Sequence, residues 1–224
     1  MKCYYQGCND EGKTKEHIPP RAFFPDGEAE QLLTVKSCVK HNNLKSKDDL
    51  YVLAQICMNA APSNRAREVF FDKVVPQLDY NNGALRRKLA AGSVPLPDGA
   101  VKYQVDICRL NDFFSALSFG VVFKTCKSVL PEDYTLNHLY PNLTSGMESL
   151  NSDIEKSLDM FYSGKPMSIL EFGKPKTKNE NIYTVEIFGR PNFSSSITIV
   201  HVFFGRFKVI SMLTKKCLNT AIPQ

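Results

Sequence analysis

The chain has 224 residues, of which 43% are hydrophobic and 23% are charged, proportions that exclude wholesale disorder. The formal net charge of +5 is mildly basic, which is compatible with a polyanionic partner but does not identify one. No apolar run approaches the roughly 20 residues of a membrane-spanning helix, and the N-terminus lacks the apolar core of a signal peptide. We therefore expect a cytoplasmic protein with no membrane partner.

The first forty residues hold three of the seven cysteines, which in a reducing compartment favours a metal site over disulfides. Cys3 and Cys8 form a C-x4-C pair, and Cys38 and His41 form a C-x2-H pair. Two such chelating pairs make the Cys3-His set that binds zinc tetrahedrally. Residues 1–49 contain little apolar sequence for a core of their own, so we predict a structural zinc. The alternative is three unrelated cysteines near an exposed histidine.

A second group of polar residues is interleaved with the first and is not needed to hold zinc. Its members are Glu16, His17, Asn42, Asn43, Asp48 and Asp49. Carboxylate and amide oxygens suit a hard ion such as Mg²⁺, and a neutral imidazole can take a proton from water. The alternative is that Glu16-His17 ends a strand before two prolines and that "HNNLKSKDD" is a solvated helix start. The residues alone leave both interpretations open.

Three helices are predicted in the middle of the chain. The first follows Asp48, and the second begins at a cap, Ser63 or Asn64, and should stop at Pro76. After a turn at "PDG" and an alternating strand, "LNDFFSALSFGVVFKTC" suits a buried helix capped by Asn111 or Asp112. Cys57 and Cys108 lie in apolar surroundings, so we expect both in the core.

The C-terminal part is predicted to mix helix and strand. The stretch from 131 to 180 is polar and poorly periodic apart from a helix in "MESLNSDIEKSLDMFYSG". "NIYTVEIFG" and "SSITIVHVFFGRFKVISML" are rich in β-branched and aromatic residues and predict two or three strands. His201 falls in this strand pattern, where we expect a hydrogen-bonded core histidine, and His138 is isolated. The fold class is α+β, with antiparallel strands at the end of the chain.

The order C-x4-C, "EHIPP" and "LLTVKSCVKHNNLKSKDDLY" resembles the HNH endonucleases in which a zinc-binding cysteine set frames the nuclease motif. The resemblance covers about residues 1–55. It implies a ββα-metal (His-Me) finger, in which two strands and a helix hold one catalytic divalent ion. We therefore expect an HNH module at 1–58, with structural zinc, and a mixed α+β domain of unassigned role at 59–224.

The resemblance also assigns roles by position. It implies that His17 is the general base, that Glu16 is a metal ligand, and that Asn42 binds the catalytic ion with Asn43 beside it. The middle Asn of the motif is missing, since that stretch offers Leu33 or Thr34. Asp48 and Asp49 resemble further ligands, with helix capping as the alternative. Basic residues around the motif could hold a nucleic-acid backbone, namely Arg21, Lys40, Lys45 and Lys47.

The function that this implies is metal-dependent hydrolysis of nucleic-acid phosphodiester bonds, with DNA favoured over RNA and Mg²⁺, Mn²⁺ or Ni²⁺ as the catalytic ion. By analogy, such proteins serve bacterial or phage defence or mobile elements. One alternative is a non-catalytic zinc module that binds nucleic acid or protein, and another is a nuclease subunit active only with a partner protein. A homodimer would place two sites on the two strands of a duplex.

Overall fold

The computed structural model describes residues 1–28, 32–46, 48–60, 63–99, 101–143, 153, 156–157, 160, 168–170 and 182–216. Lys47, the side chain of Lys45, Cys217 and most of the helix predicted within 147–164 lie outside the described part. Among the described residues, no helix combines the length and apolar character that crossing a bilayer requires.

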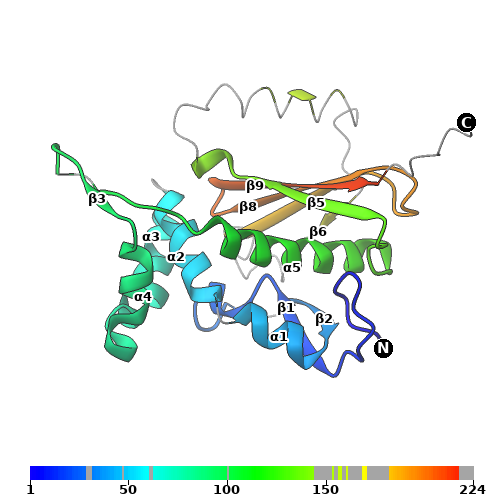
Figure 1. Ribbon diagram of the computed structural model, residues 1–224, viewed down its shortest axis with the longest axis horizontal. Coiled ribbons are helices and arrows are strands. Elements are labelled where there is room, and N and C mark those ends of the chain that lie inside the picture. Colours follow the sequence, from blue (N-terminus) through cyan, green and yellow to red (C-terminus); the bar gives the residue numbers. More distant parts are fainter. Residues whose placement is uncertain are drawn as a thin grey trace, which may run out of the picture.

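The N-terminal region forms two strands and then a helix. β1 (Thr14–Ile18) pairs antiparallel with β2 (Leu33–Ser37), and α1 (Val39–Ser46) follows directly. A single 3-10 turn, η1 (Arg21–Phe23), lies between the strands. In Figure 1 this blue region lies on one side of the long helix α5, and the large sheet lies on the other side.

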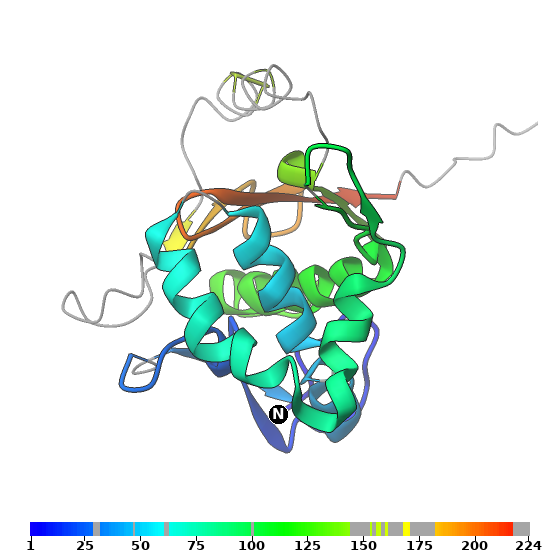
Figure 2. The same ribbon diagram turned by 90° about the vertical axis from the view of Figure 1, so that its left-hand side faces the viewer.

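Short helices cover one end of the molecule, as Figure 2 shows. They are α2 (Asp49–Asn59), α3 (Asn64–Val69), the π-helical η2 (Phe70–Val74), the 3-10 η3 (Val75–Gln77) and α4 (Tyr80–Ala90). The predicted cap at Ser63 is confirmed, because its side chain accepts a hydrogen bond from the backbone N–H of Ala66. The helical segment does not stop at Pro76 as predicted. Pro76 lies inside the 3-10 turn η3, which ends one residue later at Gln77.

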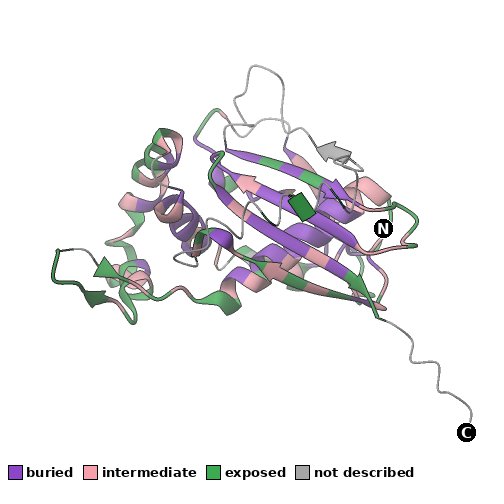
Figure 3. Ribbon diagram, turned by 90° about the horizontal axis from the view of Figure 1, so that it is seen from above, coloured by how far each residue is buried: buried purple, intermediate pink, exposed green. Residues whose placement is uncertain are grey.

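The strand predicted after "PDG" is only half of a small hairpin. β3 (Val94–Pro95) and β4 (Val101–Lys102) pair antiparallel and project from the body of the molecule (Figures 1 and 3). α5 (Ile107–Cys126) follows. The predicted caps at Asn111 and Asp112 are wrong, because the helix begins more than a turn earlier, where the carboxylate of Asp106 accepts from the backbone N–H of Arg109. Cys108 is exposed in this extra turn, which corrects its assignment to the core, whereas Cys57 is buried.

The C-terminal half forms a five-stranded antiparallel sheet with the order β5-β9-β8-β7-β6. Its strands are β5 (Tyr134–Leu139), β6 (Ser168–Leu170), β7 (Tyr183–Phe188), β8 (Ile197–Phe203) and β9 (Phe207–Lys215). The last three confirm the predicted strands. β5 and β6 occupy the stretch expected to lack periodicity, since they are edge strands whose pairing comes from neighbours distant in sequence. The α+β class is confirmed.

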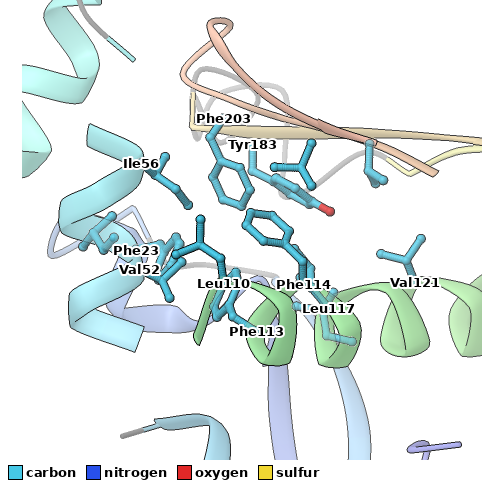
Figure 4. Close-up of a cluster of buried hydrophobic side chains, with 14 of the residues drawn as sticks. Phe23, Val52, Ile56, Leu110, Phe113, Phe114, Leu117, Val121, Tyr183 and Phe203 are labelled. Atoms are coloured by element: carbon cyan, nitrogen blue, oxygen red, sulfur yellow. The ribbon is translucent and has the colours of Figure 1, made fainter. Parts of the chain in front are cut away.

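One core runs through the molecule, with α5 at its centre. Phe114 of α5 packs edge-to-face on Phe203 of β8, and Phe113 stacks on Phe23 from η1 (Figure 4). The same cluster includes Tyr4 and Ile18 from the N-terminal region. Gly120 permits this approach, because a Cβ there would overlap Cδ1 of Ile18. Burial therefore fixes the N-terminal region against α5.

Candidate metal centre

Four predicted ligands converge at the start of α1. Cys3 and Cys8 come from the N-terminal loop, Cys38 follows β2, and His41 lies in the first turn of α1. Their sulfur and nitrogen atoms all lie within 4.8 Å of one another, so the cluster could hold a metal ion. Among the described residues it is the one group of at least three His, Cys, Asp or Glu side chains arranged in this way.

The individual separations show which atoms face the centre. Nδ1 of His41 lies 3.6 Å from Sγ of Cys3 and 3.2 Å from Sγ of Cys38. The sulfurs of Cys8 and Cys38 are 3.9 Å apart. His41 therefore presents Nδ1, and its Nε2 points away from the cluster.

Backbone groups support the sulfurs. The N–H of Cys38 lies 3.3 Å from Sγ of Cys3, and the N–H of His41 lies 3.5 Å from Sγ of Cys38. Such donors stabilise negative charge on sulfur, and thiolate is the form that binds metals. The loop itself is pinned, because the N–H of Tyr4 donates to the carbonyl of Lys36 at 3.0 Å in β2. The chain end is thus held by the strand that leads to Cys38.

Burial opposes charge on two of the ligands. It raises the pKa of the Cys8 thiol to about 11 and lowers the pKa of His41, with Lys40 adding to the second effect. A neutral imidazole is the metal-binding form of histidine, whereas the thiol must lose its proton to bind.

An aromatic contact connects the cluster to α5. The ring of Tyr5 stacks on His41, with centroids 4.0 Å apart and planes inclined by 6°, and meets Phe119 of α5 edge-to-face at 4.8 Å. Sequence reasoning missed this role of Tyr5, since only its position between two cysteines hinted at it.

Glu16 and His17 lie on opposite faces of β1. Glu16 is 6% exposed and accepts a hydrogen bond from the hydroxyl of Tyr4 at 3.3 Å, whereas His17 is half-buried on the other face. In the strand register His17 lies opposite Thr34, one of the two residues that stand in place of the missing Asn. Directly opposed side chains share a face at a Cβ separation of about 5 Å.

The remaining predicted ligands spread along the next helices. Asn42 is half-buried in α1 and Asn43 is exposed. Asp48 pairs with Arg109 of α5 and lies 3.7 Å from Nζ of Lys88 in α4. Asp49 lies in the first turn of α2. The carboxylate of Asp48 thus faces cations from distant elements, which the sequence pattern could not reveal.

The predicted backbone-binding residues Arg21 and Lys40 are both exposed. Arg21 begins η1 after the prolines, and Lys40 lies in the first turn of α1 between Cys38 and His41. The two side chains are therefore accessible to a large partner.

Two histidines outside the motif lie between α5 and the sheet. His201 is fully buried, with Nε2 3.1 Å from the Ser118 hydroxyl and Nδ1 2.7 Å from that of Tyr183. His138 lies between Ser115 and Ser211, at 3.0 and 2.8 Å. His201 is thus the hydrogen-bonded core residue that its strand pattern predicts.

No family model matches the chain, and no curated protein or solved structure matches it either.

Proposed function

We propose that the protein is a metal-dependent nuclease of the HNH type, with a structural zinc at Cys3, Cys8, Cys38 and His41. The observation that carries the proposal is the combination of a strand, strand and helix order with four convergent ligand atoms at the start of that helix. This is the arrangement that the sequence resemblance implies. It puts His17 on the strand whose partner leads into the metal cluster.

The separations in the cluster support zinc. With bonds of about 2.3 Å to sulfur and about 2.0 Å to nitrogen, tetrahedral geometry puts two sulfurs about 3.8 Å apart and a sulfur about 3.5 Å from a nitrogen. The Cys8–Cys38 separation is 3.9 Å and the Cys3–His41 separation is 3.6 Å, close to these values, whereas the Cys38–His41 separation of 3.2 Å is shorter. Three sulfurs and one imidazole are also the donor set of structural zinc sites.

In the proposed reaction His17 takes a proton from the attacking water through its imidazole. Thr34, on the same face of the hairpin, is the candidate to orient that ring. Asn42 and Glu16 are the residues that the family pattern assigns to the catalytic ion. When bound, that ion would supply charge stabilisation at the scissile phosphate. DNA is the proposed substrate, and defence or mobile-element biology the proposed setting.

The second candidate function is a zinc module that binds nucleic acid or protein without cutting it. Two observations favour it, namely the pairing of Asp48 with Arg109 and the burial of Glu16 beside Tyr4. In both contacts a protein side chain occupies a carboxylate that the nuclease pattern assigns to the metal ion. A nuclease subunit that needs a partner protein remains the third proposal.

The deciding experiment incubates the purified protein with supercoiled plasmid, single-stranded DNA and RNA in Mg²⁺, Mn²⁺, Ni²⁺ or EDTA. His17→Ala is the test variant and His138→Gln, on the far side of α5, is the matched histidine control. We expect metal-dependent cutting that disappears in His17→Ala and persists in the control. Equal cutting by His17→Ala would reject His17 as the base, and no cutting by any form would favour the binding module.

A further inference from the structure

A basic surface lies outside the motif, on α4 and the neighbouring hairpin. Residues 80–109 contain five Lys or Arg against two Asp, a net of +3 in a chain whose formal charge is +5. Arg86, Arg87 and Lys88 are consecutive in α4, and Lys102 lies on β4. All four are exposed. This end of the molecule therefore carries a group of exposed cations, of which Arg86 pairs with Asp79 and Lys88 pairs with Asp48.

Part of this charge is internally balanced, and part faces solvent. Arg86 pairs with Asp79, yet its side chain remains 62% exposed. The guanidinium of Arg87 donates to the carbonyl of Asn82, an uncharged acceptor that leaves its charge available. Exposed pairs such as Arg86–Asp79 contribute little and exchange readily with a stronger anion. Phosphates could therefore compete for these side chains.

The hairpin beside α4, formed by β3, residues 96–99 and β4, projects from the body (Figure 3). We call it the arm. Its apolar side chains face solvent, with Val94 55%, Leu96 40% and Val101 56% exposed. An isolated two-stranded hairpin is marginally stable in water. A projecting apolar arm of this kind is thus better suited to a partner than to free solution.

A cleft lies at the foot of the arm, where its lining includes Gly92 and Gln104. It has a volume of about 530 Å³ and lies between Tyr51 of α2, Lys88 of α4, and Gln104 to Arg109 at the start of α5. The two cations beside it, Lys88 and Arg109, both contact Asp48 at the end of the motif. Two cations at this end of the molecule therefore lie against Asp48, the residue that precedes α2.

We propose that this arm enters the major groove of duplex DNA while Arg86, Arg87 and Lys102 contact the phosphate backbone. The inference rests on the proposed function, which names DNA as the substrate. The major groove of B-DNA admits a two-stranded ribbon, whereas the major groove of duplex RNA is too deep and narrow for side chains to read. The flanking cations hold the backbone, and the apolar arm meets thymine methyl groups.

The test measures binding of a fluorescent 30-bp DNA duplex, with every form carrying His17→Ala so that cutting cannot interfere. The test variant is Arg86→Gln/Arg87→Gln/Lys102→Gln. The control, Lys127→Gln/Arg190→Gln/Lys216→Gln, removes the same charge from positions outside α4 and the arm. We expect the test variant to bind at least about tenfold more weakly at 0.1 M salt. Its slope of log affinity against log salt should fall by about 2 to 3.

An arm variant, Val94→Glu/Val101→Glu, changes only exposed side chains and should also weaken binding. Three outcomes would each overturn the proposal. They are equal affinity of the two glutamine triples for DNA, tighter binding of an RNA duplex than of the DNA duplex, and an arm variant that alters only the oligomeric state. The plasmid assay keeps the two proposals apart. If the wild type cuts DNA but both glutamine triples bind equally well, only the role of the arm is rejected. If the wild type binds DNA through the arm but does not cut it, only the nuclease activity is rejected.

Discussion

The regions on the two sides of α5 are stabilised in different ways. On one side, the loop from Cys3 to Cys8 and the start of α1 meet around four ligand atoms, and buried side chains such as Tyr4 and Ile18 join this region to the core. On the other side, α5 and the sheet bury phenylalanines together with His201, and His138 is half-buried beside them. Local unfolding follows local contact density, so the two regions should differ in what unfolds them. Metal should control the first region and packing the second.

The largest effect should come from Cys38→Ala, which removes one ligand and the contact that its sulfur accepts from the backbone N–H of His41. We expect metal content to fall to near zero and residues 1–46 to lose protection from hydrogen exchange, because structural metal binding contributes folding energy directly. The sheet should keep its protection. Cys108→Ala is the matched control, since Cys108 is exposed and distant from the cluster. Normal metal content in Cys38→Ala would rule out the zinc assignment.

The converse change is Phe114→Ala, in the middle of α5. Phe114 is fully buried and contacts Phe113, Tyr140, His201 and Phe203. Deleting a buried phenylalanine side chain costs about 3–5 kcal/mol of unfolding free energy. Urea denaturation followed by circular dichroism measures this loss, with Phe71→Ala, which removes an exposed ring, as control. Metal bound per folded molecule should not change, and a Phe114→Ala loss below about 1 kcal/mol would contradict the central role of α5.

Acid should weaken the side that contains the buried histidines. Burial lowers the pKa of His138 from 6.5 to about 4 and that of His201 well below 6.5. The unfolded chain therefore binds more protons, so stability is complete above about pH 6.5 and is lost as the pH falls toward 4. Each histidine can contribute up to about 1.4 kcal/mol per pH unit in that window.

Urea unfolding at pH 7, 6 and 5 measures this slope. His138→Gln should reduce the slope, because one of the three histidines with a lowered pKa is removed. The control is Lys102→Gln, an exposed lysine on β4, which should leave the slope unchanged. A His138→Gln protein with the wild-type pH dependence would show that His138 does not titrate in this window.

The smallest effect concerns the junction between the two regions. Gly120→Ala should destabilise the protein by about 1–2 kcal/mol. The free-energy cost of the steric overlap with Ile18 should exceed the stabilisation from the higher helix propensity of alanine. Ile18→Val removes the Cδ1 atom that is overlapped, so the double variant should recover most of the loss. Thermal melts of the single and double variants test this coupling. If the losses of stability from the two single variants simply add in the double variant, the contact between Ile18 of β1 and Gly120 of α5 is rejected.

Several features were predictable because they depend on residues close in sequence. The zinc-type pairs Cys3/Cys8 and Cys38/His41 were visible as spacings, although their meeting point was not. The cap at Ser63 and the strands in "TVEIF" and "ITIVHVF" followed from side-chain chemistry and alternation. The start of α5 was misplaced, since Ile107 ends the alternating stretch "VKYQVDI" that predicts a strand, and the cap depends on one carboxylate, that of Asp106.

The sequence by itself determined the ligand types, the helical and strand periodicities and the excess of positive charge in residues 80–109. These properties reside in single residues or in neighbours one turn apart, so spacing is enough to find them. Only the tertiary structure decided that Asp48 meets Arg109, that Tyr5 covers His41, and that the arm projects beside α4. Those contacts join segments far apart in the chain, and their partners are selected by packing around α5 rather than by local spacing.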